Sequence, residues 1–440
     1  MSGGMIRARV AWERFWRRYE RMFAVDEIER SRTLQLAGGV LLLGWLLEFQ
    51  NWSRFPDLSV NAVRDGLHLC WPWFQGCGDW YFLTMGSLGY SQQVFYAGLL
   101  GLIVLGGVAL VYRRFSYAHA IFLTLFTWEV IGIVLSYRMA VNYWYIHILF
   151  GAMFLFARGK LAFLRIIAVV FYFFAGIIKL DSSWLSGKYF SALSDGLYLF
   201  PDAFIPVATN AVVLMELALV WLLLSSRREY RLSVLAILFV FHVYSAIYVG
   251  FTYPTIVLPM VLVLFLSREE TPFRPNVIGK SVVGTFIVVA FAASHLVPFL
   301  IEGDVRITLE GNKYGNYMFR ANYQCESKAN FVYSDGRIEE RDSTSFFANY
   351  RCEPYGHFFY FKQMCISDDT IERIGWTFDT SVDGSPLQRI VDVEDACSLE
   401  YKAFSHNEWI RLPGKDEVEV VGIPAKNRYL PSDPTWQNFR

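Results

Sequence analysis

Long runs of apolar residues fill the chain before residue 300, and short polar connections separate them. The runs are roughly 18–22 residues long, the length of α-helix that crosses the hydrocarbon core of a bilayer. Beyond about residue 300 the pattern changes to short alternating runs with turn dipeptides, which is typical of strands. We therefore predict an α-helical polytopic membrane bundle of about nine transmembrane helices, followed by a mostly β extracytoplasmic domain. The predicted spans are 33–50, 91–112, 117–137, 141–157, 162–180, 206–225, 232–250, 253–267 and 280–300.

The segment 1–30 is predicted to be an amphipathic helix on the cytoplasmic surface of the membrane. Aromatic residues at helical spacing lie among its arginines: Trp12, Phe15, Trp16, Tyr19 and Phe23 among Arg7, Arg9, Arg14, Arg17, Arg18, Arg21 and Arg30. The alternative is an ordinary N-terminal helix packed on the bundle. The predicted division of the chain is then this segment, a membrane bundle over 31–300 and a β-rich domain over 301–440.

Basic residues gather in the connections that follow the even-numbered spans. They are Arg113 and Arg114; Arg158, Lys160 and Arg165; Arg227, Arg228 and Arg231; and Arg268, Arg274 and Lys280. Because loops rich in Lys and Arg stay in the cytoplasm, we expect a cytoplasmic N-terminus and a periplasmic, extracellular or luminal tail. A miscount by one span would reverse the side of the tail. The compact length favours a bacterial inner membrane.

The six cysteines test this orientation independently, since all lie in segments assigned to the outer side. An even number of cysteines on one side predicts disulfides in an oxidising compartment. Cys70 and Cys77 lie close enough in sequence for a local bridge, whereas Cys325, Cys352, Cys365 and Cys397 allow three pairings. No cysteine or histidine spacing matches a zinc motif, so we predict no metal site.

The tail reads as mostly β structure. The segment 330–342 predicts a hairpin around Ser334-Asp335-Gly336-Arg337, because glycine accepts a positive φ. We expect further strands at 418–423 and, with a glycine turn between them, at 303–323, and one helix near 388–404.

The composition agrees with a membrane protein: 54% of the residues are hydrophobic and 18% are charged. The 40 basic and 40 acidic residues leave no net charge, so nucleic-acid binding has no electrostatic support. Polar residues within the spans are therefore informative, because such groups face the bundle interior or a wet cavity. They are Glu48, Glu129, Asn142, Tyr143, Tyr145, His147, Lys179, Glu216 and His242, and most lie in the outer halves of the spans, where they could form one pocket.

Each of these residues also has an ordinary structural explanation. Lys179 could extend its amine to the membrane surface, as lysines at span ends usually do. His242 could be a hydrogen-bonded packing residue, and Glu129 and Glu216 could pair with polar groups between helices. Tyr143 and its neighbours also fit an aromatic belt.

One segment, AGIIKLDSSWLSGKYF at 175–190, resembles the region around the catalytic lysine of vitamin K-dependent γ-glutamyl carboxylases, which belong to the wider HTTM superfamily of membrane bundles. The matching positions are Ala175, Gly176, Lys179, Leu180, Asp181, Trp184 and Gly187. FHVYSAIYVGF (241–251) is similar to the family's Phe-His segment and places His242 on the family histidine. EGNKYGNYMFR (310–320), NFVYSDGRIEERD (330–342) and LQRIVDVEDAC (387–397) resemble later segments in the family order.

The chain departs from the family pattern at two points. The carboxylases carry Asn-His where this chain has Asn142-Tyr143. His147 lies one helical turn further on the same face, and we interpret it as a substitute for the family histidine. The chain is also much shorter than animal carboxylases and lacks most of their distal domain, so recognition of a propeptide in the animal manner is not expected.

The resemblance implies a carbon–carbon lyase with a coupled epoxidase activity. Its cofactor is reduced vitamin K, its co-substrates are O2 and CO2, and its substrate is a glutamate-containing peptide. In the family, reduced vitamin K and oxygen yield a base strong enough to take the γ-proton of glutamate, and the vitamin leaves as its epoxide. The protein then needs only a modest base and a dry pocket.

On this interpretation Lys179 is the base, since desolvation makes an amine lose its proton more easily. His242, Asn142, Tyr143 and His147 stabilise charge or hold the glutamate. Asp181 is a helix-end or orienting group, Trp184 a pocket wall, and Glu48, Glu129 and Glu216 line the pocket.

Two alternatives remain open. One is an HTTM-type membrane protein that matures a secreted peptide, or binds quinone or lipid, without carboxylase activity. The other is a transporter, which usually shows internal repeats and interrupted helices that this sequence lacks.

Overall fold

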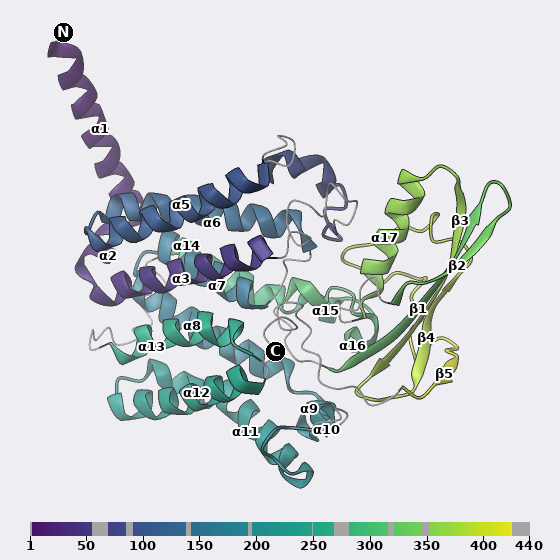
Figure 1. Cartoon of the computed structure of the whole chain (residues 1–440). Helices are drawn as coiled ribbons and strands as arrows, with labels where there is room; N and C mark the ends of the chain where they lie inside the picture. The colour runs from purple at the N-terminus through teal and green to yellow at the C-terminus, as the bar shows by residue number, and fades with distance from the viewer. Residues whose placement is uncertain are drawn as a thin grey trace.

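The structure is a computed structural model of the whole chain. It describes residues 2–54, 69–84, 91–137, 142–191, 196–248, 250–267, 281–315, 321–344 and 352–424. A helical bundle occupies one end of the molecule and a small sheet the other, with the earliest helix extending away from both (Figure 1).

The N-terminal segment forms α1 (Ser2–Phe23) and α2 (Val25–Arg30). The start of α1 points away from the bundle (Figure 1), and the side chains of Trp12 and Phe15 are exposed. Only its last turns touch the bundle, where the Tyr19 hydroxyl hydrogen-bonds to His119 Nδ1 at 2.7 Å. Contact of this helix with a membrane surface stays a prediction.

Every predicted span coincides with an apolar helix of the bundle. These helices are α3 (Arg32–Arg54), α5 (Ser91–Val111), α6 (Phe115–Leu135), α7 (Asn142–Phe156), α8 (Lys160–Ile178), α11 (Ile205–Leu217) with its 3-10 continuation (Leu219–Leu224), α12 (Arg228–Tyr248), α13 (Thr252–Leu266) and α14 (Val282–Ser294). Most of α8 is buried, so it forms the centre of the bundle.

The predicted number of spans was too high for the described helices. Five are long and apolar enough to cross a membrane: Arg32–Asn51, Phe115–Leu135, Lys160–Ile178, Asp202–Leu224 and Arg228–Ile247. Four apolar helices are shorter: Tyr96–Val111, Tyr143–Phe156, Thr252–Leu266 and Val282–Ser294. A 15-residue helix rises only about 22 Å, against a bilayer core of about 30 Å. The predicted span 280–300 is interrupted after Ser294 and resumes as α15 (Val297–Leu300), which has a proline in its first turn.

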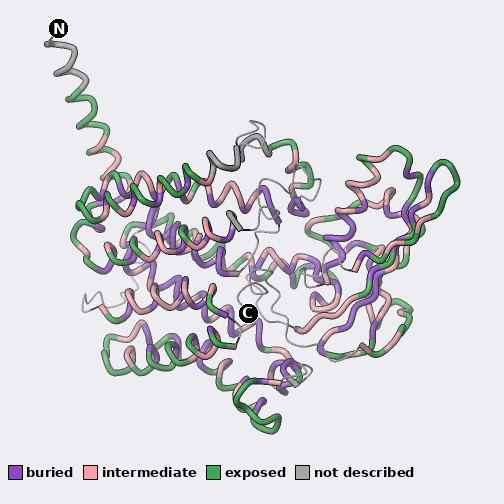
Figure 2. Tube along the Cα trace, viewed as in Figure 1, coloured by how far each residue is buried: buried purple, intermediate pink, exposed green. Residues whose placement is uncertain are grey.

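The outer faces of the bundle are exposed (Figure 2), and many of the exposed side chains on them are apolar. Val104 in α5, Val240 in α12 and Phe286 in α14 each expose more than half of their surface. Soluble proteins rarely present large contiguous apolar surfaces to water. These faces are consistent with contact to lipid.

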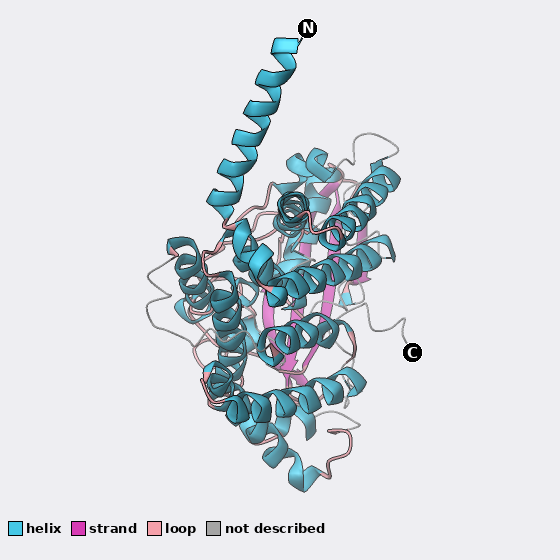
Figure 3. Ribbon diagram, turned by 90° about the vertical axis from the view of Figure 1, so that its left-hand side faces the viewer, coloured by secondary structure: helices cyan, strands magenta, loops and turns pink. Residues whose placement is uncertain are grey.

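The tail contains a five-stranded antiparallel sheet in the order β2-β1-β3-β4-β5. Its strands are β1 (Tyr323–Tyr333), β2 (Ile338–Asp342), β3 (Ile371–Val382), β4 (Leu387–Val393) and β5 (Val420–Gly422). Helix α17 (Pro354–Ser367) packs on β3, between the sheet and the bundle (Figure 1). Figure 3, in which the bundle faces the viewer, shows the strands behind the helices.

The predicted hairpin at 330–342 is confirmed. β1 and β2 pair with Val332 opposite Ile338, and Gly336 in the turn between them has a φ of 83°. The strand expected at 418–423 is also confirmed as β5.

Two other predictions for the tail were wrong. The first of the two strands predicted in 303–323 is instead α16 (Val305–Thr308) and the 3-10 turn Asn312–Tyr314, because the Asp304 carboxylate caps the backbone N–H of Arg306 and starts a helix. The second predicted strand includes 316–320, which lie outside the described residues. The helix expected near 388–404 is strand β4, whose Ile390 and Val391 complete the sheet core. The longest helix in the described part of the tail is α17, which has a proline in its first turn.

All six cysteines form disulfides, in the pairs Cys70–Cys77, Cys325–Cys352 and Cys365–Cys397. The first bridge is the predicted local one. The other two select one of the three possible pairings in the tail. Sequence spacing could not choose between them, because the choice depends on how α17 lies against the sheet.

The tail docks on one end of the bundle. The Tyr355 hydroxyl in α17 donates to the Cys70 carbonyl at 2.8 Å, and the Tyr145 hydroxyl in α7 donates to the Lys313 carbonyl at 2.5 Å. The Tyr137 hydroxyl at the end of α6 donates to Glu353. One continuous apolar core runs from the bundle into the sheet, so the tail is not a loosely tethered module.

Candidate functional site

Lys179 lies just past the last residue of α8, at its C-cap, and it is buried. Its Nζ donates to both carboxylate oxygens of Glu216 in α11, at 2.9 and 2.7 Å, and to the Ala175 carbonyl at 3.1 Å. The carbonyls at a helix C-terminus lack intrahelical partners and attract cations. The amine at the end of this apolar helix is thus stabilised by a carbonyl of the same helix and by the buried Glu216 carboxylate.

Gly176 explains why α8 and α11 come close enough for this pair to form. A Cβ added at Gly176 would lie 2.9 Å from the Glu216 Cβ and 2.9 Å from side-chain atoms of Leu217. The two helices therefore touch at a position where only a glycine fits. The Ala-Gly pair before the lysine has this physical role in the structure.

Asp181 and Trp184 lie beyond Lys179 on the short helix α9 (Ser182–Leu185). The Asp181 carboxylate caps α9 by accepting from the Ser183 N–H at 2.8 Å. The Trp184 ring centre lies 5.6 Å from Lys179 Nζ, and its Nε1 donates to the Thr209 carbonyl at 3.2 Å. Trp184 therefore forms an aromatic wall beside the amine.

The tail closes the outer side of this region. Arg306 in α16 donates to Asp181 Oδ2 at 2.5 Å and also bonds Asp304, and these carboxylates raise the pKa of the Arg306 guanidinium. The Asn322 side-chain amide donates to the Tyr189 carbonyl in α10 (Lys188–Ser191). Burial raises the pKa of Asp383, whose Oδ1 accepts from the Asn322 N–H at 2.9 Å.

His242 lies deeper in the bundle and does not contact Lys179 through any hydrogen bond of the described residues. Its Nε2 pairs with the hydroxyl of Tyr172, a buried residue of α8. Tyr172 precedes Lys179 by seven residues, which places it on the same helix face about 10 Å away along the axis. Sequence reasoning did not single out Tyr172, although its spacing from Lys179 was a usable signal.

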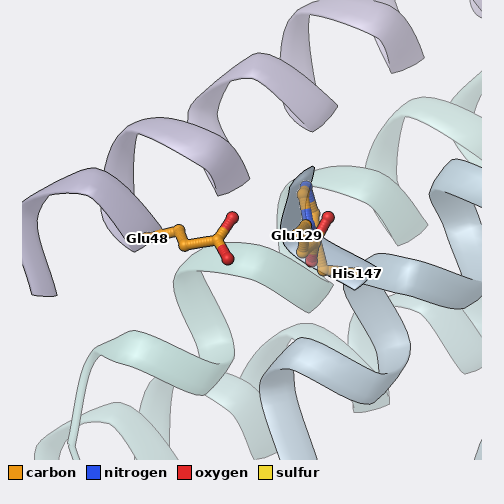
Figure 4. A group of neighbouring side chains, drawn as sticks. All are labelled: Glu48, Glu129 and His147. Atoms are coloured by element: carbon orange, nitrogen blue, oxygen red, sulfur yellow. The ribbon is translucent and has the colours of Figure 1, made fainter. Parts of the chain in front are cut away.

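A second polar group joins Glu48, Glu129 and His147, from α3, α6 and α7 (Figure 4). His147 Nδ1 lies 2.8 Å from Glu129 Oε1, and His147 Nε2 lies 3.0 Å from the Leu41 carbonyl. Both ring nitrogens of His147 are thus engaged away from Lys179. The substitution of His147 for the family histidine beside Lys179 finds no support in this arrangement.

Three further predicted residues, Asn142, Tyr143 and Tyr145, lie in the first turn of α7. Asn142 begins α7, but its side chain lies outside the described residues. Tyr143 is buried, with its ring centre 4.7 Å from that of Trp144. Tyr145 holds the tail through Lys313, as described above.

The polar residues therefore form two main groups instead of one outer pocket. One groove among the described residues lies at the opposite end of the bundle, where α3 begins and α13 ends, and its lining includes Arg32, Thr33 and Leu262. It is not the outer cavity expected from the sequence.

Comparisons of the sequence and the structure with known proteins found no matching family, no curated relative and no solved structure. The likeness to the carboxylases consequently rests on the quoted sequence segments alone.

Proposed function

We propose that this chain is an integral-membrane enzyme of the γ-glutamyl carboxylase type, which couples oxidation of reduced vitamin K to carboxylation of a peptide glutamate. The observation that carries the proposal is the buried Lys179–Glu216 pair, with Trp184 beside it and the tail closing the outer side. The pair lies at the outer end of the central helix, where a lipid-soluble ligand and a secreted peptide can both arrive.

The pair is suited to handling one proton in a dry place. Lys179 and Glu216 expose only 4% and 3% of their side chains, so little water competes for the hydrogen bonds between them. In this proposal Glu216, in place of Lys179, takes the proton from a ligand hydroxyl, and the Lys179 amine stabilises the anion that forms.

The residues around the pair fit a quinol ring as a ligand. All three N–H donors of Lys179 are used within the protein, whereas each Glu216 oxygen accepts one of them and retains a free lone pair. A ligand hydroxyl would therefore donate to Glu216 and its ring would lie against Trp184. When bound, reduced vitamin K would supply the base strength for the weakly acidic γ-proton that no side chain can provide.

His242 and Asp181 act in this proposal through other groups. His242 fixes α12 against α8 through Tyr172, and so holds the helix that carries Lys179. Asp181 orients Trp184 by capping α9 and links the site to the tail through Arg306. Both are positioning residues, and the tail would present the glutamate of the peptide.

We also propose the orientation in which the N-terminus is cytoplasmic and the tail is periplasmic, extracellular or luminal. The three disulfides support it, because all lie in the first outer loop and the tail, and disulfides persist in oxidising compartments. A bacterial inner membrane remains the favoured location.

A second function is favoured by one specific observation. The donors of Lys179 are fully satisfied by Glu216 and Ala175, which is what a purely structural ion pair between helices needs. An HTTM-type protein that serves in the maturation of a secreted peptide, or binds quinone or lipid without carboxylating anything, would keep this pair.

One assay separates the two functions. Purified protein in detergent would receive reduced vitamin K, oxygen, labelled bicarbonate and a short glutamate peptide, with epoxide and peptide-bound label as readouts. We expect both products from the wild type and from Lys188→Ala, a control at an exposed lysine nearby, and neither from Lys179→Ala. An absence of epoxide from the wild type across several quinones and peptides would reject the carboxylase and leave the second function.

A further inference from the structure

Glu48, Glu129 and His147 bring three metal-binding side chains to one buried point. Their ligand atoms all lie within 4.8 Å of one another, and each residue exposes at most 2% of its surface. Figure 4 shows the Glu48 carboxylate pointing from its helix toward the other two residues. The group is separate from the Lys179–Glu216 pair, so this inference does not depend on the proposed function.

Helix α3 forms hydrogen bonds to His147 Nε2 and to one carboxylate oxygen of Glu129. The Leu41 carbonyl can only accept a hydrogen bond, so His147 Nε2 carries a hydrogen and donates it. Trp45 Nε1 donates to Glu129 Oε2 at 2.9 Å. His147 Nδ1 lies 2.8 Å from the remaining oxygen of Glu129, and a bound cation would take the place of the proton between these two atoms. Metal-binding histidines in proteins usually donate their other ring nitrogen to a backbone carbonyl or a carboxylate in this way.

The Glu48 carboxylate supplies the second observation. Its Oε1 is buried and has no hydrogen-bond partner among the described residues, although it points into the group. A buried carboxylate oxygen without a partner is costly. An atom bound at this point would satisfy it.

The charges of the group indicate that the bound atom would be a cation. Among the described residues, neither Glu48 nor Glu129 forms an ion pair with a lysine or an arginine. As metal ligands, two carboxylates and a neutral imidazole would carry a charge of −2, which one divalent cation would neutralise in a region where isolated charges are unfavourable. Protons on the carboxylates are the competing solution.

We propose that Glu48, Glu129 and His147 bind one divalent first-row transition-metal ion. Two carboxylates and one imidazole suit Mn2+, Fe2+, Co2+ or Zn2+ better than Ca2+ or Mg2+, which prefer oxygen ligands alone. Three protein ligands leave coordination positions open for water or a substrate group. This proposal departs from the sequence-based prediction of no metal site, since the three residues lie on different helices and form no local motif.

Gly44 in α3 leaves the space that the His147 ring occupies. A Cβ at Gly44 would lie 2.2 Å from His147 Nε2, so the imidazole can occupy its position only because α3 has no side chain there. The space for His147 is thus built into the helix that also supplies Glu48 and Trp45.

The test is direct binding to the full-length protein in detergent. After treatment with a chelator, the wild type would be dialysed against Mn2+, Fe2+, Co2+ or Zn2+ separately, and metal would be counted by mass spectrometry. We expect about one ion per chain and a visible absorption spectrum for the Co2+ form with nitrogen and oxygen ligands. Glu48→Gln and His147→Gln should lose most of this binding. Trp45→Phe should weaken it about 10–100-fold, because it removes only a bond to a ligand.

Glu310→Gln is the matched control, because Glu310 is a buried glutamate that also pairs with a histidine, His406, at 2.7 Å, but has no second carboxylate in the group. It should bind metal as the wild type does. The proposal fails if the wild type retains no more metal than Glu48→Gln at any of the four ions. In that case a higher unfolding temperature of Glu48→Gln would show that protons, not a cation, neutralise the group. The wild-type titration decides the question even if a variant does not fold.

Discussion

The pairing of Lys179 with Glu216 makes a strong prediction about stability. The perturbations are Lys179→Met and Glu216→Leu, singly and together. Each single variant removes one charge and leaves the other buried, with its hydrogen bonds lost. Breaking a buried ion pair in this way costs about 3–5 kcal/mol. Replacing both charges with apolar residues of similar size is often neutral or stabilising.

The magnitude follows from a double-mutant cycle. If each single variant loses about 3–5 kcal/mol and the double variant loses no more than one of them, the coupling energy is at least about 3 kcal/mol. The unfolding temperature, measured by tryptophan fluorescence in one detergent, should place the double variant close to the wild type and both single variants well below. Lys188→Ala should match the wild type.

The cycle also separates folding from chemistry. The double variant should be folded yet unable to form vitamin K epoxide, because the proton-handling pair is gone. Additive losses in the cycle, with the double variant the least stable of the four proteins, would refute the pairing itself. A stable and fully active double variant would instead assign the pair a structural role only.

Three further outcomes are expected. Gly44→Ala should destabilise the protein by about 1–3 kcal/mol, since its new Cβ would overlap His147, whereas Gly39→Ala in the same helix has nothing within 4 Å and should be neutral in thermal unfolding. Burial lowers the pKa of His357 to about 3, so the unfolded chain binds the proton more readily below about pH 6.5. Stability should then fall by up to about 1.4 kcal/mol per pH unit below 6.5, and His357→Phe should flatten this slope in unfolding measured between pH 7 and 4.5. Burial raises the pKa of Asp383, so its ionised form weakens the fold as the pH rises above about 4; Asp383→Asn should raise the unfolding temperature at pH 7 but not at pH 4.

Periodicity alone located the helices and some of the strands. Each apolar run between residues 33 and 300 became a helix, because the length and polarity of a run depend on neighbours that are close in sequence. The hairpin around Gly336 was predictable for the same reason. Local patterns did not show that α14 stops at Ser294, or that 387–393 pairs with β3 instead of forming a helix, since a short apolar run fits either structure.

The candidate site was predictable only in part. The segment around Lys179 drew attention to the lysine, Asp181 and Trp184 together, and polarity within the spans drew attention to Glu216 and His242. Which of these residues touch was not contained in the pattern. Glu216 meets Lys179 because Gly176 lets two helices approach, and His242 meets Tyr172 instead.

What the sequence by itself determined was therefore the set of apolar helices, the central hairpin of the tail and the list of polar residues that a bilayer would not tolerate alone. Tertiary structure decided how those polar residues divide. Glu48, Glu129 and His147 come from helices separated by up to about a hundred residues of chain, and their meeting depends on the packing of α3, α6 and α7. The partner of a buried charge depends on how distant helices pack and on the free-energy cost of leaving that charge unpaired. Neither can be predicted from the spacing of residues that are close in sequence.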